Sequence, residues 1–558
     1  MSRTKKREPP RRQPLTGSGA VLAPTDKFTE FLERRSLLLA VALILLGTIR
    51  IVSTYWVFNH VVDEPGHIAA GMEWLEKGIY TWEAQHPPLA RVVSALGPYL
   101  LGIRTQGTPN TGLISLWHEG VRILYYGHHY ETTLAVARAF MLPFFWIGCL
   151  AVYWWGCLQF SRAVAVIAVF LFSFTPPVLA HAGFTTTDMA LTGFFALAFV
   201  AGLAWIERPT PLRAAGFGVA TALMVLSKFS CMAFFPAVVA LALAGYWLAE
   251  RPSPSALFQA AKLRLPTFAL AVAVSLVVIW AGYRFSFGSV SPGGMSVPAP
   301  EFFKGIQEVR SHLDRGHEGY LLGEIRNTGF WDFYLVAIAV KTPIGFLALL
   351  AIGLVLVFRR YPLARCLWLP LMLALGVLLV GIFSTVNIGV RHVLPVYVGF
   401  SLLAAVAVVK LWEAGRAKPW IRAVLGALLL WFAGSSLLSH PDYLPYFNEV
   451  TLFTAPENIL VDSDLDWGQD LKRLSTRLRK LGATSVTLNN FDYADLEKEH
   501  GFPHINGMSP ATPFSGYNAL GFTLWKEFRV ATWPDRYPPT ERVGKGMLLW
   551  YFQPETRK

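Results

Sequence analysis

The chain has 558 residues, of which 54% are hydrophobic, 14% aromatic and only 15% charged. This composition excludes a string of ordinary soluble domains and predicts a polytopic membrane protein. The formal net charge of +13 does not by itself predict a nucleic-acid partner. Part of this charge lies in a basic N-terminal tail, which we expect to bind an anionic membrane surface. All four cysteines lie in apolar stretches, so they predict neither a disulfide framework nor a thiolate metal site.

The sequence divides into three parts. Residues 1–36 are expected to form a basic, proline-containing cytoplasmic tail without fixed structure. Residues 37–439 are expected to form the transmembrane domain, and residues 440–558 a small α/β domain outside the cytoplasm. We expect no cleavable signal peptide, because the first apolar run is too long for one and lacks a small-residue cleavage site.

Apolar runs long enough to cross about 30 Å of hydrocarbon predict the membrane spans. One stretch, residues 214–249, is too long for a single span, and we divide it into two at Ser227–Ser230. With that division the basic loops all lie on the side of the N-terminal tail, as the positive-inside rule requires. About eleven transmembrane helices result, with the N-terminus in the cytoplasm and the C-terminus outside. The remaining runs are 37–57, 135–157, 163–181, 189–206, 266–284, 334–357, 365–384, 392–411 and 420–438.

Function is expected on the outer face, which receives a large first loop at 58–134, a loop at 285–333 and the C-terminal domain. In the first loop, Pro65 is a favoured first helical residue and Gly78 a stop, so an amphipathic helix is predicted between them. The C-terminal domain alternates between a helical stretch at 469–481, a strand-like Ser485–Leu488 and an apolar segment at 547–552. These alternations predict its α/β architecture.

Two carboxylates and a histidine follow the first span closely, at Asp63, Glu64 and His67. Charged groups beside hydrocarbon are costly, and catalysis is a physical reason to keep them there. Asp63 could act as a general base toward an acceptor hydroxyl. The simpler alternative is that Asp63 caps the following helix, which would need neither Glu64 nor His67.

Other ionisable residues are expected on the same face. Asp188 lies in a short link between spans, as either a second catalytic carboxylate or a helix cap. Arg391 and Lys341 interrupt apolar segments and are candidates to bind a phosphate, the alternative being side chains that reach the membrane interface. His86 precedes two prolines that hold the backbone extended, and it could donate to a phosphate. Lys228 is expected to reach the interface rather than to function.

The acidic run from Asp462 to Asp470 matches known metal motifs poorly. As a calcium loop it has its glycine one residue late, and Arg473 stands where a bidentate glutamate should be. We expect this run to cap the helix at 469–481 and to pack the C-terminal domain against the membrane part. No metal is therefore required, although a divalent ion remains compatible with the sequence.

Together these residues resemble bacterial polyprenyl-phosphate-dependent glycosyltransferases of the GT-C class, the superfamily that includes protein O-mannosyltransferases and the lipid A aminoarabinose transferase. The resemblance implies that Asp63 and Asp188 are catalytic carboxylates. Pro65-Gly66 stands before His67 where the mannosyltransferases have one residue, which counts against protein O-mannosylation. The segments that carry the resemblance are Asp63-Glu64, His86-Pro87-Pro88-Leu89, Asp188, Lys341-Thr342-Pro343, Gly389 to Pro395 and Asp462 to Asp470.

We therefore expect a glycosyltransferase of the bacterial inner membrane, either a hexosyl- or a pentosyltransferase. It would move a sugar, with inversion, from a polyprenyl-monophosphate carrier to a hydroxyl of an extracytoplasmic glycolipid, polysaccharide or protein. A lipid or lipid-linked-sugar transporter is the alternative, and it would place its ionisable groups near the bilayer midplane. A non-catalytic scaffold would leave the first-loop cluster unexplained. The expected site residues are Asp63, Glu64 and Asp188 for catalysis and His67, His86, Lys341 and Arg391 for substrate and phosphate binding, with no cofactor.

Overall fold

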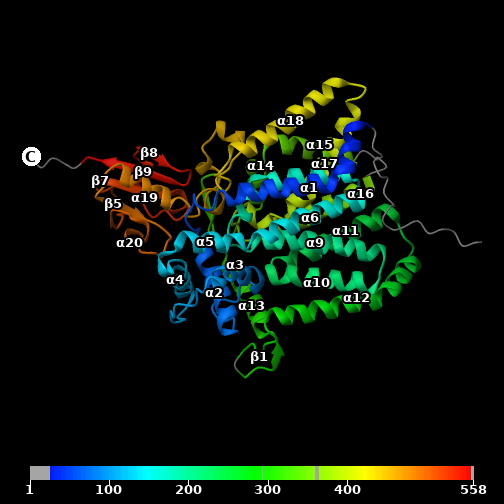
Figure 1. Ribbon diagram of the computed structural model, residues 1–558, viewed down its shortest axis with the longest axis horizontal. Helices are drawn as coiled ribbons and strands as arrows, with labels where there is room; N and C mark the ends of the chain where they lie inside the picture. Colours follow the sequence, from blue (N-terminus) through cyan, green and yellow to red (C-terminus); the bar gives the residue numbers. More distant parts are fainter. Residues whose placement is uncertain (1–25, 292, 359–363, 554–558) are drawn as a thin grey trace, which may run out of the picture.

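The computed structural model describes residues 26–291, 293–358 and 364–553. Most of the basic tail expected at 1–36 lies outside these residues, and helix α1 begins at Lys27, ten residues before the expected span. Figure 1 shows a bundle of long helices with the C-terminal sheet and the loop helices gathered at one end. That end holds all three regions expected on the outer face.

The helix bundle confirms the predicted polytopic fold. By length and composition, seven helices of the described residues can cross a membrane, or up to nine if each of two bent pairs is one span, against the eleven expected; two shorter apolar helices lie beside them. The bends are 66° between α7 and α8 and 118° between α14 and α15. The helices of the bundle are α1 (Lys27–Val52), α5 (Tyr130–Ala139) with α6 (Leu142–Gln159), α7 (Arg162–Phe174) with α8 (Pro176–Ala182), α9 (Asp188–Glu207), α10 (Pro211–Ser227), α11 (Cys231–Glu250), α12 (Pro254–Gly282), α14 (Phe333–Lys341) with α15 (Ile344–Phe358), α16 (Ala364–Ile382), α17 (Val396–Ala414) and α18 (Pro419–Leu438).

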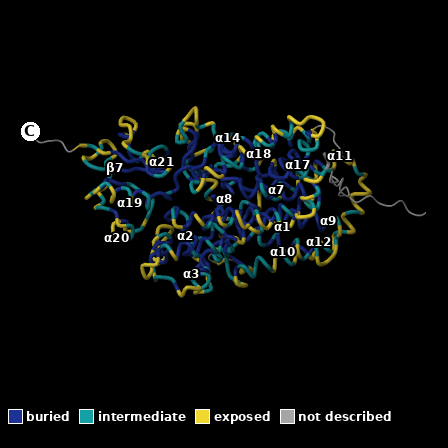
Figure 2. Tube along the Cα trace, turned by 45° about the horizontal axis from the view of Figure 1, so that its top comes forward, coloured by how far each residue is buried: buried dark blue, intermediate teal, exposed yellow. Residues whose placement is uncertain are grey.

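Burial separates central spans from peripheral ones. In the most apolar window of α9, 89% of residues are buried, against 6% in α12. The buried segments run through the middle of the bundle in Figure 2. An apolar helix that exposes its side chains on all sides is stable in lipid but not in water, so α12 and α18 form the lipid-facing rim.

The first loop folds into helices α2 (Glu64–Lys77), α3 (Pro88–Leu100) and α4 (Leu113–Leu124) with the short η1 (Tyr126–His128). The predicted limits of α2 are confirmed, because Pro65 lies in its first turn and Gly78 ends it with φ +70°. The second loop contains β1 (Phe287–Ser289), β2 (Ser296–Pro298), α13 (Pro300–Arg315), β3 (Gly319–Leu321) and β4 (Glu324–Arg326).

The C-terminal part is the expected α/β unit, with strand order β6-β5-β7-β9-β8. Strand β5 pairs parallel to β6 and β7, whereas β9 pairs antiparallel to β7 and β8. Leu471, Leu474 and Leu478 lie on one face of α19 and pack on the sheet. The elements are η5 (Asp462–Asp464), α19 (Leu471–Lys480), β5 (Ser485–Asn489), α20 (Leu496–His500), β6 (His504–Asn506), β7 (Gly516–Gly521), α21 (Phe522–Lys526), β8 (Glu541–Val543) and β9 (Met547–Phe552); η2 (Val390–Val393) lies between α16 and α17.

The orientation in the membrane can be measured directly. Asn110 is exposed in the first loop and Arg208 is exposed in the link between α9 and α10. In intact cells we expect Asn110→Cys, but not Arg208→Cys, to react with a membrane-impermeant maleimide from outside the cytoplasmic membrane. If only the Arg208→Cys variant reacted, the predicted orientation would be wrong and the opposite orientation would hold.

Candidate functional site

A cavity of about 1160 Å³ lies where the first loop, the second loop and the C-terminal part meet the bundle. Ionisable side chains that include Asp63, His86 and Arg391 line one part of it. Apolar side chains from α11 and α16, among them Phe234 and Leu379, line another part. The cavity therefore offers a charged region and an apolar region to one ligand.

Four charged residues from distant parts of the sequence form a chain of ion pairs beside this cavity. Arg391 Nη1 lies 3.0 Å from Asp63 Oδ2 and 3.8 Å from Asp188 Oδ2. Lys228 Nζ lies 2.6 Å from Asp188 Oδ1. The Asp63 side chain is 27% exposed and that of Asp188 only 1%. Asp63 is thus the more accessible of the two carboxylates, and it is the one that lines the cavity.

The two predicted acidic residues do not act as helix caps. Asp63 precedes α2 without a side-chain capping bond, and Thr187 rather than Asp188 holds the N-cap position of α9. The capping alternative is therefore wrong for both residues. Their side chains instead point to cations from other elements.

Arg391 remains charged in this setting. Burial opposes its charge, but Asp63 and Asp188 raise the pKa of Arg391 above its ordinary value. Its Nε donates to Ile388 O and Ser463 Oγ and its Nη1 to Asp63, whereas Nη2 has no hydrogen-bond partner among the described residues. One donor group of a fixed guanidinium is therefore free to bind an anion.

Glu64 ties the first loop to the link before α9. Its carboxylate accepts two bonds from Arg138, at 2.9 and 2.7 Å, and one each from the amides of Val61 and Thr185 at 2.9 Å. Burial opposes its ionisation, but Arg138 and the amides hold the pKa of Glu64 below its usual value. The residue is fully buried and absent from the cavity lining, so this geometry favours a structural role over its predicted catalytic one.

His67 and His86 meet at the cavity wall, with ring centroids 5.2 Å apart. Arg91 Nε donates to His67 Nδ1 at 2.9 Å, and Arg91 also pairs with Glu83. Burial and then Arg91 hold the pKa of His67 well below its usual range. Because Nδ1 accepts a bond, the neutral ring carries its proton on Nε2, so His67 is a neutral donor at pH 7.

Lys341 does not line the cavity. Its ammonium is buried and donates to two backbone carbonyls, Leu444 O at 2.7 Å and Asp464 O at 2.5 Å. These bonds hold the chain after α18 and the segment at η5 against the bend between α14 and α15. Its predicted contact with phosphate stays a prediction that the geometry does not favour.

The acidic run at 462–470 contributes to the cavity, which the sequence did not reveal. Asp462 and Asp466 line it, and Asp470 accepts bonds from Arg473 and from the amides of Lys545 and Gly546 instead of capping α19. The expected cap is therefore wrong, although the expected packing against the membrane part is found. Burial raises the pKa of Asp466 to about 7.

A buried glutamate behind this run makes stability depend on pH. Glu527 is 3% exposed, and no group of the described residues bonds its Oε2. Burial first, and then Asp462 and Glu318, raise the pKa of Glu527 to about 9. The folded protein therefore binds a proton that the unfolded chain releases above about pH 4.3.

We expect Glu527→Gln to raise the unfolding temperature relative to the wild type by an amount that grows as pH rises from 5 to 9. Glutamine resembles the protonated acid, so the substitution should matter little at pH 5 and should stabilise at pH 9. Thermal unfolding of the detergent-solubilised protein measures this difference. An equal pH dependence in both proteins would contradict it.

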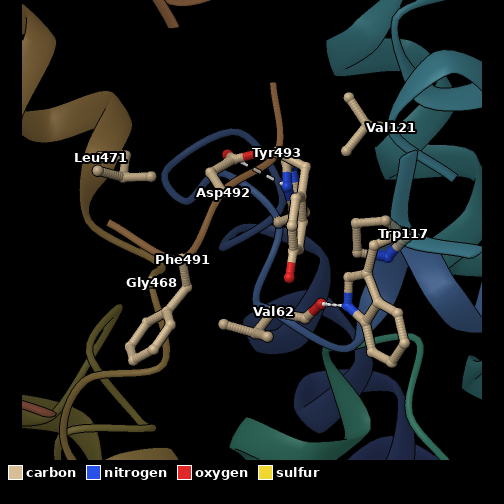
Figure 3. Close-up of a pocket in the computed structure, with 10 residues that line it drawn as sticks. Val62, Trp117, Val121, Gly468, Leu471, Phe491, Asp492 and Tyr493 are labelled. Carbon is tan, nitrogen blue, oxygen red and sulfur yellow. Dashed lines mark hydrogen bonds and ion pairs between the residues drawn. The ribbon is translucent and has the colours of Figure 1, made fainter. Parts of the chain in front are cut away.

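A second, much smaller pocket of about 10 Å³ lies between the first loop and the C-terminal part. Figure 3 shows Asp492 and Tyr493 facing Val62 and Trp117 across it. The ion pair of Asp492 Oδ2 with His60 Nε2 at 3.2 Å is buried there, and Trp117 Nε1 donates to Val62 O at 2.7 Å. These contacts fix the residues next to Asp63 against the C-terminal part.

Sequence reasoning missed three cations that hold the acidic residues. Lys228 was assigned to the interface, yet it is buried against Asp188 and lines the cavity. Arg91 lies in the first loop, and Arg138 lies within the apolar run expected to span the membrane at 135–157. The available signal was that Lys228 and Arg138 each interrupt an apolar run.

No group of three or more side chains suited to hold a metal ion occurs in the described residues. The charged cluster beside the cavity consists of arginine, lysine and carboxylate groups.

No protein-family model and no curated protein matches the chain. It is similar to the solved structures of ArnT from Cupriavidus metallidurans bound to undecaprenyl phosphate and in the apo state, at 14% and 13% identity. Both have a TM-score of 0.49 and cover 91% of this chain and 97% of that chain. The oligosaccharyltransferase of Archaeoglobus fulgidus in the apo form has 12% identity and a TM-score of 0.45, covering 73% of this chain and 56% of that one. Because these TM-scores are below 0.5, the likeness says nothing about activity. The residues of this chain alone support the activity proposed below.

Proposed function

We propose that the protein is a membrane glycosyltransferase that takes a sugar from a polyprenyl-monophosphate carrier and transfers it to an acceptor hydroxyl outside the cytoplasm. The observation that carries the proposal is the chain of ion pairs from Asp63 through Arg391 and Asp188 to Lys228, at one side of a large cavity with an apolar wall. A lipid-linked sugar has a charged phosphate and an apolar tail, and this cavity offers a place for each.

The apolar wall supports a ligand that comes from the bilayer. The lining includes Met232 of α11, Leu379 of α16 and Phe383 directly after α16, which are 44%, 43% and 79% exposed. An exposed apolar wall of this kind would let a polyprenyl chain remain among apolar groups while its phosphate reaches Arg391. A water-soluble donor would gain nothing from it.

The proposed reaction is an in-line displacement at the anomeric carbon. The acceptor oxygen forms the new bond to that carbon while its proton passes to the Asp63 carboxylate. The bond from the anomeric carbon to the phosphate oxygen breaks, and polyprenyl phosphate leaves with the electron pair. The configuration of the sugar is inverted because attack and departure occur on opposite faces.

Fixed hydrogen-bond donors, one charged and one neutral, stabilise the charge that grows on the leaving phosphate. Arg391 offers its free Nη2 group, and His67 offers a neutral Nε2 donor from the cavity wall. Asp188, which lines no part of the cavity, holds Arg391 and Lys228 in place from behind. In this scheme Asp63 is the base and Asp188 orients the cations.

Purified protein incubated with a panel of radiolabelled polyprenyl-phosphate sugars and membrane-extracted acceptors tests the proposal. We expect one donor to be consumed, with label appearing in the acceptor and free polyprenyl phosphate released in equal amount. A transporter would move the donor across proteoliposome membranes and leave it intact. That outcome would replace the proposed function with the transporter alternative. The position of the ionisable groups counts against a transporter, because they lie at one end of the bundle rather than near the bilayer midplane.

A further inference from the structure

The segment 462–468, here called the bridging segment, lies between the two elements that carry Arg391 and Asp63. On one side it contacts the Arg391 turn, η2. On the other side the amide of Val62 donates to Trp467 O at 3.2 Å, and Asn59 Nδ2 donates to Gly468 O at 2.8 Å. The relative position of Arg391 and Asp63 therefore depends on a segment from the C-terminal part of the chain.

Ser463 holds the guanidinium of Arg391 directly. Arg391 Nε donates to Ser463 Oγ at 2.9 Å, and Ser463 Oγ donates in turn to Ile388 O at 2.6 Å. The serine is 1% exposed and does not line the cavity, so it cannot contact a ligand there. Its hydroxyl is placed to fix the plane of the guanidinium.

The backbone of η2 leaves room for this contact and is itself held. Gly389 has φ +87°, and an added Cβ would lie 2.6 Å from Ser463 Oγ. The amide of Val390 donates to the Asp464 carboxylate at 3.1 and 3.3 Å. Glycine is therefore required at the point where the bridging segment approaches η2 most closely.

Trp467 supports the opposite side of the same guanidinium. Its ring lies 4.1 Å from Arg391 Cζ, the distance of a stacked cation–π pair. The indole is 3% exposed, packs edge-on against Phe184 and His181, and borders the cavity. The hydrogen bond from Nε to Ser463 and the stacked ring of Trp467 together restrict the orientation of the Arg391 guanidinium.

We propose that Ser463 and Trp467 are positioning residues that aim the Arg391 guanidinium at the phosphate of the lipid ligand. The inference rests on the proposed function, and it makes the C-terminal part a component of the site rather than an attachment to it. Asp63 and Arg391 remain the groups that meet the reacting molecules. Ser463 and Trp467 act through Arg391, whereas Asp462 and Asp466 of the same segment line the cavity themselves.

The test measures the affinity of the full-length protein in detergent for decaprenyl phosphate and, separately, kcat for sugar transfer. We expect Ser463→Ala to weaken binding and to lower kcat, each about tenfold, because a hydrogen bond to a charged group is lost. In an Arg391→Lys background, which has no Nε donor, the same substitution should change either value by less than twofold. If Ser463 served stability alone, Ser463→Ala would lower affinity and kcat equally in the wild-type and Arg391→Lys backgrounds.

Ser475→Ala is the matched control, since Ser475 is a buried serine of the same part of the chain that donates to His500 O at 2.6 Å far from Arg391. We expect it to leave affinity and kcat at wild-type levels. Trp467→Phe should retain most of the affinity because a ring face remains, whereas Trp467→Leu should lose about tenfold.

The outcomes separate the two proposals. Equal losses for Ser463→Ala in both backgrounds, or no loss beyond that of Ser475→Ala, would overturn the positioning role and leave the proposed function standing. Wild-type protein that binds decaprenyl phosphate but transfers no sugar would overturn the proposed function, and the affinity measurements would still decide the positioning role. Absence of binding by the wild type would overturn both.

Discussion

Asp63→Asn is expected to yield a folded protein whose sugar transfer is slower by about 10²- to 10⁴-fold, the usual contribution of a general base. Asparagine keeps the size of the side chain and can still accept a bond from Arg391, but it cannot take the proton of the acceptor. The fold should tolerate the change, because Asp63 makes no capping bond and is 27% exposed. The initial rate of label transfer measures the effect.

Asp442→Asn is the control for this substitution. Asp442 is also an aspartate paired with an arginine, with Arg473 Nη1 2.6 Å from its Oδ1, but it does not line the cavity. We expect transfer by this variant to match the wild type. Near-normal transfer by Asp63→Asn would refute the assignment of the base.

Glu64→Gln is expected to lower the free energy of unfolding by about 3 to 5 kcal/mol, because it leaves the charge of Arg138 buried without a counter-charge. The amide nitrogen of glutamine would also face donors, either Arg138 or the amides of Val61 and Thr185. Thermal unfolding in detergent measures the loss. The fraction that remains folded should still transfer sugar, because Glu64 does not reach the cavity.

Glu73→Gln provides the comparison on the same helix. Glu73 is 3% exposed and accepts bonds from Thr81 and from the amide of Trp82, without an arginine partner among the described residues. We expect it to cost about 1 to 3 kcal/mol. If both variants unfolded at the same temperature, the ion pair with Arg138 would contribute nothing beyond ordinary hydrogen bonds.

The span pattern could be predicted because hydrocarbon permits only long apolar helices, so composition alone marks most of them. The limits of α2 followed from Pro65 and Gly78, whose backbone preferences are local. The bends at 66° and 118° were not predicted. Pro176 and Pro343 lie at or beside these bends, and proline is the local signal that could have indicated them.

The site was only partly predictable, for a different physical reason. Asp63, Asp188 and Arg391 could be selected because each charge stands beside apolar sequence. Glu64 and Lys341 met the same criterion, yet they satisfy their charges inside the protein. A local pattern cannot distinguish a charge that faces a cavity from one that is bonded within the fold, since the partners come from distant segments.

The apolar cavity wall on α11 and α16 has a consequence for how the proposed lipid-linked donor would reach the site. A ligand that arrives along such a wall is dissolved in a two-dimensional solvent, so its effective concentration is its mole fraction in the bilayer or micelle. The total donor concentration that gives half-maximal rate should therefore rise when detergent is added. The original rate should return when the ratio of donor to detergent is restored. Rates compared between laboratories would agree only on that surface scale.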